Sequence, residues 1–277
     1  MNSSYKTSPT QKILVNGVWF TYRVTGSGDG LPLVLFNHLT GNLDNWDPRV
    51  IDALASKHKV ISFNNRGVGS SGGKVPLTVE AMARDGIAFI EALGYSKVNI
   101  LGFSLGGMVA QELIRLRPEL VEKLILAGTG PAGGPGMENV TRLTYYDIFR
   151  GLITFQDPKV FLFFTRTANG KQKAKEFLAR LKERSANRDK EISVPNFQRQ
   201  LKAIHSFALQ KPVDLGYITQ PTLVANGDND RMVPTINTKD LARRIKNSQL
   251  VIYKDAGHAG IFQEYEQFNK TALDFLR

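Results

Sequence analysis

Short runs of aliphatic and β-branched residues alternate with segments of helical period along most of this sequence. The strand-like runs are 31–37, 59–64, 97–103, 121–128, 221–227 and 249–254. The helix-like segments are 47–56, 78–93, 105–116, 238–245 and 263–276. Such alternation favours parallel strands joined by right-handed helical crossovers, with helices on both faces of the sheet. The predicted fold class is α/β, with a mostly parallel, doubly wound sheet.

Two regions depart from this alternation. Residues 12–15 and 18–24 flank Asn16-Gly17, a pair that supplies the positive φ angles of a type I′ turn, so an antiparallel hairpin is predicted at the start. After the turn-rich stretch 130–136, roughly 80 residues are mainly helical and are interpreted as an inserted cap. The predicted organisation is a first core part at 1–130, a helical cap at 131–215 and a second core part at 216–277.

Composition restricts the class of protein further. The chain has 277 residues and 42% hydrophobic content, enough for a sizeable core. No apolar run approaches the roughly 18 residues of a membrane span, and the first ten residues lack the apolar stretch of a secretory signal. We therefore expect a cytoplasmic protein with no membrane partner, either a monomer or a homodimer. The absence of cysteine excludes disulfides, thiolate metal sites and a cysteine nucleophile.

The net charge of +11 raises the question of a polyanionic partner. Much of the charge is local, because residues 171–190 carry eight basic and three acidic side chains, a net +5. Phe177, Leu178 and Leu181 recur there at helical spacing, which is typical of an amphipathic helix with a solvated basic face. No nucleic-acid-binding motif accompanies the stretch, so no nucleic-acid partner is expected.

A possible nucleophile lies between a predicted strand and a predicted helix. Gly102-Phe103-Ser104-Leu105-Gly106 has the pattern G-x-S-x-G, which is weak alone but specific in a strand–turn–helix setting. The sharp turn strains the backbone at Ser104, so the flanking residues must lack bulk. Ser104 is the candidate nucleophile.

A serine hydroxyl needs a base to take its proton. Of the four histidines, His258 follows the last predicted strand, at the sheet edge where Ser104 also lies. The base in turn needs a carboxylate, and both Asp228 and Asp230 follow the preceding strand, so by position either can serve. The order Ser, Asp, His along the chain predicts a catalytic triad.

Four segments together carry a resemblance that spans nearly the whole chain. They are Gly102–Gly107, the turn 65–71 (NRGVGSS), the segment 227–234 (GDNDRMVP) and Gly257-His258. In these segments the chain resembles the α/β-hydrolase family, in its serine-nucleophile branch with an inserted cap. The resemblance favours Asp230 over Asp228 as the triad carboxylate. It implies no cofactor and no metal.

Two positions differ from the pattern of that family. Relatives usually carry His-Gly in the oxyanion loop, whereas here Asn37-His38-Leu39 stands there, with His38 at the position of the glycine. The resemblance implies that the backbone N–H groups of Leu39 and Leu105 form the oxyanion hole, with Thr40 as the alternative to Leu39. Asn64 replaces a common aspartate, and a structural role is expected for it.

The predicted cap is rich in aromatic residues, and one or two of them are expected to face Ser104. Candidate pocket residues are His38, Thr40, Phe149 and Phe163. An apolar roof favours small, largely apolar esters, lactones or activated carbonyl compounds cleaved through an acyl-enzyme, with a small molecule as the only expected partner. Cofactor-free perhydrolase or haloperoxidase-like turnover remains an alternative, as does a ligand receptor with little turnover. A serine at position 104 disfavours dehalogenase and epoxide hydrolase chemistry, because relatives with those activities need an aspartate at this turn.

Overall fold

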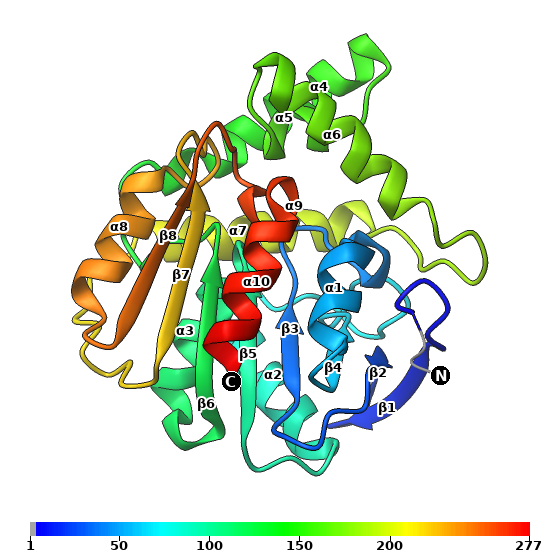
Figure 1. The fold of residues 1–277 in the computed structure, drawn as a ribbon, viewed down its shortest axis with the longest axis vertical. Helices are drawn as coiled ribbons and strands as arrows, with labels where there is room; N and C mark the ends of the chain where they lie inside the picture. The colour runs from blue at the N-terminus through cyan, green and yellow to red at the C-terminus, as the bar shows by residue number, and fades with distance from the viewer. Residues whose placement is uncertain (1–3) are drawn as a thin grey trace.

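A computed structural model describes residues 4–277, and a sheet of eight strands forms its centre (Figure 1). The strands are β1 Gln11–Val15, β2 Val18–Thr25, β3 Leu33–Phe36, β4 Val60–Phe63, β5 Val98–Phe103, β6 Val121–Ala127, β7 Thr222–Gly227 and β8 Ser248–Tyr253. They lie in the order β1-β2-β4-β3-β5-β6-β7-β8. Strands β3 to β8 pair in parallel, while β2 pairs antiparallel with both β1 and β4. The predicted α/β fold class is confirmed.

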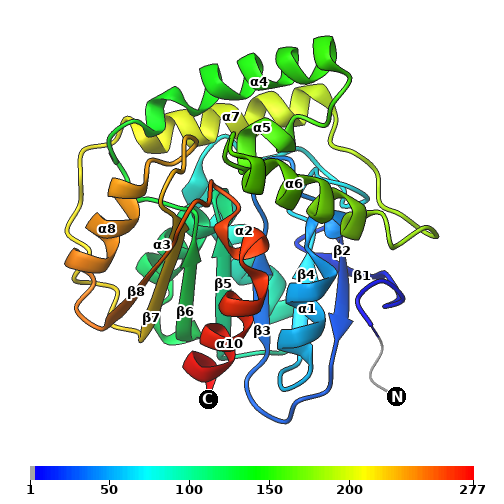
Figure 2. The ribbon, with the colours of Figure 1, turned by 45° about the horizontal axis from the view of Figure 1, so that its top comes forward.

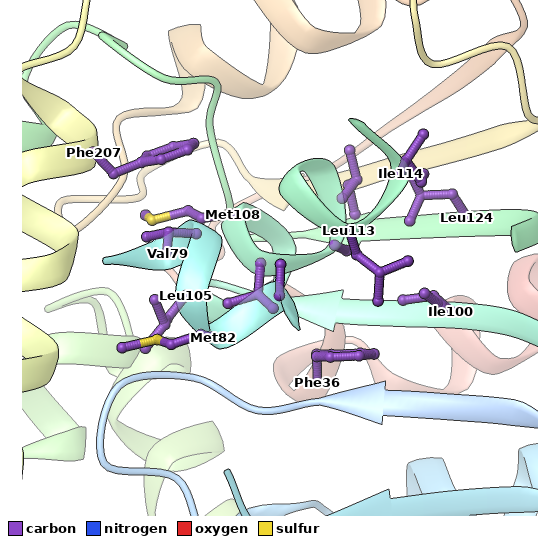
Figure 3. Close-up of a cluster of buried hydrophobic side chains, with 14 of the residues drawn as sticks. Phe36, Val79, Met82, Ile100, Leu105, Met108, Leu113, Ile114, Leu124 and Phe207 are labelled. Atoms are coloured by element: carbon purple, nitrogen blue, oxygen red, sulfur yellow. The ribbon is translucent and has the colours of Figure 1, made fainter. Parts of the chain in front are cut away.

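Helices cover both faces of this sheet, because both faces are apolar. The helices of the core are α1 Pro48–Ala55, α2 Val79–Ala92, α3 Leu105–Leu116, α8 Thr235–Arg244, α9 Gly260–Gln263 and α10 Tyr265–Leu276. In β3, Val34 and Phe36 join the core cluster under α2, α3 and α8, whereas Leu33 and Leu35 join the cluster under α1 and α10. Figure 3 shows Phe36 in the first cluster, on the same side as Ile100 and Leu113. Because β3 is buried on both faces, its sequence is an uninterrupted run of apolar residues.

Local signals set most element boundaries. Asn16 and Gly17 have φ angles of 47° and 77°, as the predicted hairpin turn requires. Asp47 caps α1 by accepting a hydrogen bond from the N–H of Arg49. The segment 263–276, predicted as one helix, is two helices, because the backbone at Glu264 leaves the helical region and α9 starts earlier, at Gly260.

Four helices between β6 and β7 cover the carboxyl edge of the sheet (Figure 2). They are α4 Val140–Thr154, α5 Lys159–Phe163, α6 Ala168–Leu181 and α7 Val194–Ala208. Within residues 4–277, no helix combines the length and the apolar character that crossing a bilayer demands.

The basic stretch 171–190 is only partly a solvated helical face. Helix α6 ends at Leu181, and the three arginines of the stretch all make contacts within the protein. Arg180 pairs with the buried carboxylate of Asp47, at 2.7 Å. Arg184 is buried and donates to the carbonyl groups of residues 6 and 8. Arg188 donates to the carbonyl of Leu181, closing the end of the helix.

Candidate active site

Ser104 sits on the tight turn between β5 and α3, where its backbone has a φ angle of 56° and a ψ angle of −116°. A non-glycine residue pays a steric cost at such an angle, so the surrounding structure must hold it there. A Cβ on Gly106 would collide with the carbonyl of Phe36, and one on Gly102 would press against the carbonyl of Gly106, at 2.5 Å. Both glycines are thus required by the close approach of the backbone, as the sequence predicted.

A chain of hydrogen bonds joins Ser104 to His258 and Asp230. The Ser104 Oγ lies 2.9 Å from His258 Nε2, and His258 Nδ1 lies 2.7 Å from Asp230 Oδ2. Because a carboxylate can only accept, Nδ1 carries the proton and Nε2 is free to accept from the serine hydroxyl. All three residues are buried. The arrangement is a Ser-His-Asp triad in geometry.

The carboxylate of Asp230 is itself fixed. Its Oδ1 accepts from the N–H groups of Met232 and Val233, at 2.8 and 2.9 Å, and its Oδ2 accepts from the Asn226 amide at 3.0 Å. Asp228 is exposed and accepts from the N–H of Ala256 instead, away from the imidazole. Asp230 is therefore the carboxylate that orients the ring.

Two backbone N–H groups beside Ser104 have no hydrogen-bond partner anywhere in residues 4–277: those of Leu39 and Leu105. Unpaired N–H groups at this position are the donors that an oxyanion hole requires. The N–H of Thr40 is occupied, because it donates to Gln200 Oε1 of α7 at 2.8 Å. This pairing favours Leu39 over Thr40 as the partner of Leu105.

His38 is a buried neutral imidazole. Its Nδ1 lies 2.7 Å from the carbonyl of Leu39, so that nitrogen carries the proton. Burial away from water lowers the pKa of His38 to about 3, and the nearby ammonium of Lys159 adds to the effect. The ring packs edge-on against Phe103 and Phe163, with centroid separations of 5.4 and 5.1 Å. His38 thus serves as a packed wall of the site and stays uncharged at neutral pH.

A cavity of about 150 Å³ opens above Ser104 between the core and the cap helices. It is lined by His38, Leu39, Thr40, Ser104, Thr144, Ile148, Asp157, Pro158, Lys159, Leu162, Phe163, Phe197, Met232 and His258. Three of the candidate pocket residues, His38, Thr40 and Phe163, line this cavity.

Phe149 does not line this cavity. Its side chain is 61% exposed, and the preceding residue, Ile148, faces the cavity together with Thr144, one helical turn away. Successive residues of a helix point about 100° apart, so a one-residue error in the predicted face turns a pocket residue to the surface. The expectation for Phe149 is corrected to Ile148.

The sequence analysis missed Gln200 and gave Asn64 only a general role. Gln200, on cap helix α7, accepts a hydrogen bond from the N–H of Thr40 in the core. The two residues are 160 positions apart, so no local sequence pattern predicts this contact. Asn64 accepts from the N–H of Leu43 and donates to Thr21 Oγ1, which gives it the structural role expected. No group of metal-binding side chains occurs among residues 4–277.

The nucleophile turn, the triad and the parallel sheet together define a hydrolase-type protein. Residues 32–265 match the family described as the alpha/beta hydrolase fold, and the chain belongs to that family.

Named relatives share most of their length with the chain. An alpha/beta hydrolase fold protein from Chitinophaga pinensis is 35% identical, covers 99% of each chain and superposes with a TM-score of 0.93. A putative carbamate hydrolase RutD from Rhizobium rhizogenes is 28% identical over 90% of this chain and 94% of its own. A poly(3-hydroxyalkanoate) depolymerase from Ectopseudomonas oleovorans is 30% identical over 89% of this chain and 84% of its own.

Proposed function

We propose that this protein is a serine hydrolase that cleaves a small, largely apolar ester, lactone or activated carbonyl compound through an acyl-enzyme. The observation that carries the proposal is the hydrogen-bonded series Ser104, His258, Asp230 beside two unpaired N–H groups. The relatives named as a carbamate hydrolase and a polyester depolymerase also cleave acyl–heteroatom bonds, which supports this reaction class.

In the proposed reaction, Ser104 Oγ attacks the substrate carbonyl while its proton passes to His258 Nε2. Asp230 stabilises the imidazolium, and the N–H groups of Leu39 and Leu105 stabilise the oxyanion. Collapse of the intermediate breaks the bond to the leaving group, which takes the proton from His258. Water then repeats the sequence on the acyl-enzyme and releases the carboxylic acid.

The walls of the cavity limit the substrate. Leu162, Phe163, Phe197 and Met232 supply apolar surface, and about 150 Å³ is below the usual size of a drug-sized ligand site. We expect short apolar acyl groups to be preferred over polar groups of equal length.

Matched p-nitrophenyl esters test this proposal. The butanoate and the methoxyacetate have acyl chains of the same length, and we expect kcat/KM, corrected for the intrinsic reactivity of each ester, to favour the butanoate. Ser104→Ala should abolish turnover of both. Preference for the methoxyacetate would refute the apolar pocket, and turnover by Ser104→Ala would refute the mechanism. Peroxide-dependent halogenation with acetate, run alongside, would reveal perhydrolase turnover.

A further inference from the structure

The outer side of helix α4 is unusually apolar for a surface. Six exposed side chains form what we name the α4 stripe: Tyr145, Tyr146, Phe149, Leu152, Ile153 and Phe155. The first five recur at three- and four-residue spacing and so share one side of the helix, and Phe155 follows directly after its last residue. Leu152 is 73% exposed and Phe155 is 96% exposed. Contiguous apolar surface of this kind marks an interaction site.

Phe155 adds a conformational cost to this exposure. It ends α4 with a φ angle of 55°, the left-handed conformation for which glycine is the usual residue. The backbone of a residue with a bulky side chain is strained at this angle. The ring of Phe155 also gains almost no burial within the protein. Folding alone gives no reason for an aromatic residue at this position, whereas a partner that buries the ring does.

The position of α4 relates the stripe to the active site. In Figure 2, α4 lies outermost over the carboxyl edge of the sheet, with α7 beneath it. Thr144 and Ile148 of the same helix line the cavity above Ser104. A partner that covers the stripe therefore lies one helix away from the candidate active site.

The cap that carries the stripe is predominantly basic. Among residues 138–175, the exposed charged side chains are four bases, Arg142, Arg166, Lys171 and Lys175, and one acid, Glu138. Residues 131–215 carry fifteen basic and eight acidic side chains, a net +7 of the chain's +11. A groove of about 470 Å³ beside Tyr145 is lined by Arg142 and Lys202, with Glu138 as its one acid. These charges complement an anionic partner.

We infer that the α4 stripe docks on the surface of a membrane that contains anionic phospholipids. Apolar side chains entering the acyl boundary, flanked by Lys and Arg near the headgroups, are how an amphipathic helix lies on a bilayer. A second copy of this chain fits less well, because it would bring two caps of net +7 together. The sequence led us to expect no membrane partner, since it shows no spanning segment; the stripe becomes visible only once α4 is placed. Docking does not depend on the proposed reaction.

Vesicle cosedimentation tests this docking without any assay of activity. The Ser104→Ala protein is mixed with vesicles of phosphatidylcholine alone or of phosphatidylcholine and phosphatidylglycerol at 70:30. We expect binding to the anionic vesicles at least tenfold tighter than to the neutral ones, weakening as salt rises. The triple variant Phe149→Ser, Leu152→Ser, Phe155→Ser should lower binding to the anionic vesicles at least tenfold.

The hairpin provides a matched control. Leu14 and Trp19 are 51% and 54% exposed on β1 and β2, so Leu14→Ser with Trp19→Ser removes apolar surface elsewhere and should leave vesicle binding unchanged. Equal loss in this control, or equal binding to both kinds of vesicle, would overturn the inference. So would a wild-type dimer in sedimentation velocity that the triple variant converts to monomer, with no vesicle binding by either.

Discussion

Gln200 joins the cap to the oxyanion loop through a single hydrogen bond. Its Oε1 accepts the N–H of Thr40, which has a φ angle of 65°, and so fixes the peptide next to Leu39. Replacing Gln200 by leucine would leave that N–H unpaired and free the loop. We predict that Gln200→Leu lowers kcat about tenfold or more with KM little changed, because an oxyanion donor acts mainly in the transition state.

Asn196 is the matched control for this prediction. It lies on the same helix and bonds another core loop, accepting from the N–H of Val75 and donating to the carbonyl of Gly67. Asn196→Leu should lower the melting temperature while leaving kcat within about twofold of wild type. If both variants lose kcat equally, Gln200 acts through the general stability of the cap and not through the loop.

His38 makes the stability of the protein depend on pH. Its pKa falls to about 3 in the folded state because of burial, so between that value and the ordinary 6.5 the unfolded chain binds more protons. The free energy of unfolding therefore rises with pH in this window, and the contribution of His38 is lost progressively as pH falls below about 6.5. We predict that urea unfolding between pH 6 and pH 4 shows a slope shallower by about 1 kcal/mol per pH unit in His38→Gln. An unchanged slope would contradict the buried neutral state.

At the scale of elements, the turn between β5 and α3 depends on glycine. A Cβ on Gly106 would overlap the carbonyl oxygen of Phe36. A Cβ on Gly30, by contrast, would meet no atom within 4 Å. We predict that Gly106→Ala costs more than about 2 kcal/mol of unfolding free energy or prevents folding. Gly30→Ala should change it by less than about 0.5 kcal/mol. Chemical denaturation of the two variants compares them, and equal stability would refute the steric account.

The core elements were predictable because their signals are local. The apolar runs of the buried strands, the Asn16-Gly17 turn and the Asp47 cap each carry their own physical cause within a few residues. The Ser104 turn was predictable for the same reason, since its glycines and its strand–turn–helix setting are contiguous.

The cap contacts were not predictable in the same way. Whether Phe149 or Ile148 faces the cavity depends on how α4 is rotated against the core, which a helical pattern with apolar residues on several sides leaves open. The hydrogen bond from Thr40 to Gln200 joins residues 160 positions apart. Arg184 was interpreted as part of a solvated face, but it is buried and donates to the carbonyl groups of residues 6 and 8, which lie more than 170 positions earlier in the chain.

At the scale of the whole molecule, Arg180 ties the cap to the core. Its guanidinium pairs with Asp47, which is fully buried, and donates to the carbonyl of Phe262. Burial raises the pKa of Asp47, and the hydrogen bond from Arg180 opposes that rise, so the carboxylate depends on this partner. We predict that Arg180→Met lowers the free energy of unfolding by about 3 kcal/mol.

An exposed pair supplies the comparison for Arg180. Lys97 and Glu122 pair at 2.7 Å with both side chains nearly half exposed, so Lys97→Met should cost less than about 1 kcal/mol. Denaturant titration of the two variants measures the difference. If Lys97→Met costs as much as Arg180→Met, the cap is held to the core by other contacts.

Covalent labelling with a fluorophosphonate, followed by peptide mapping, tests most directly that Ser104 is activated by His258. We predict stoichiometric modification of Ser104 in the wild-type protein, none in Ser104→Ala, and labelling of His258→Gln slowed by about 1,000-fold or more. Modification of a different residue, or a labelling rate that His258→Gln leaves unchanged, would contradict the account.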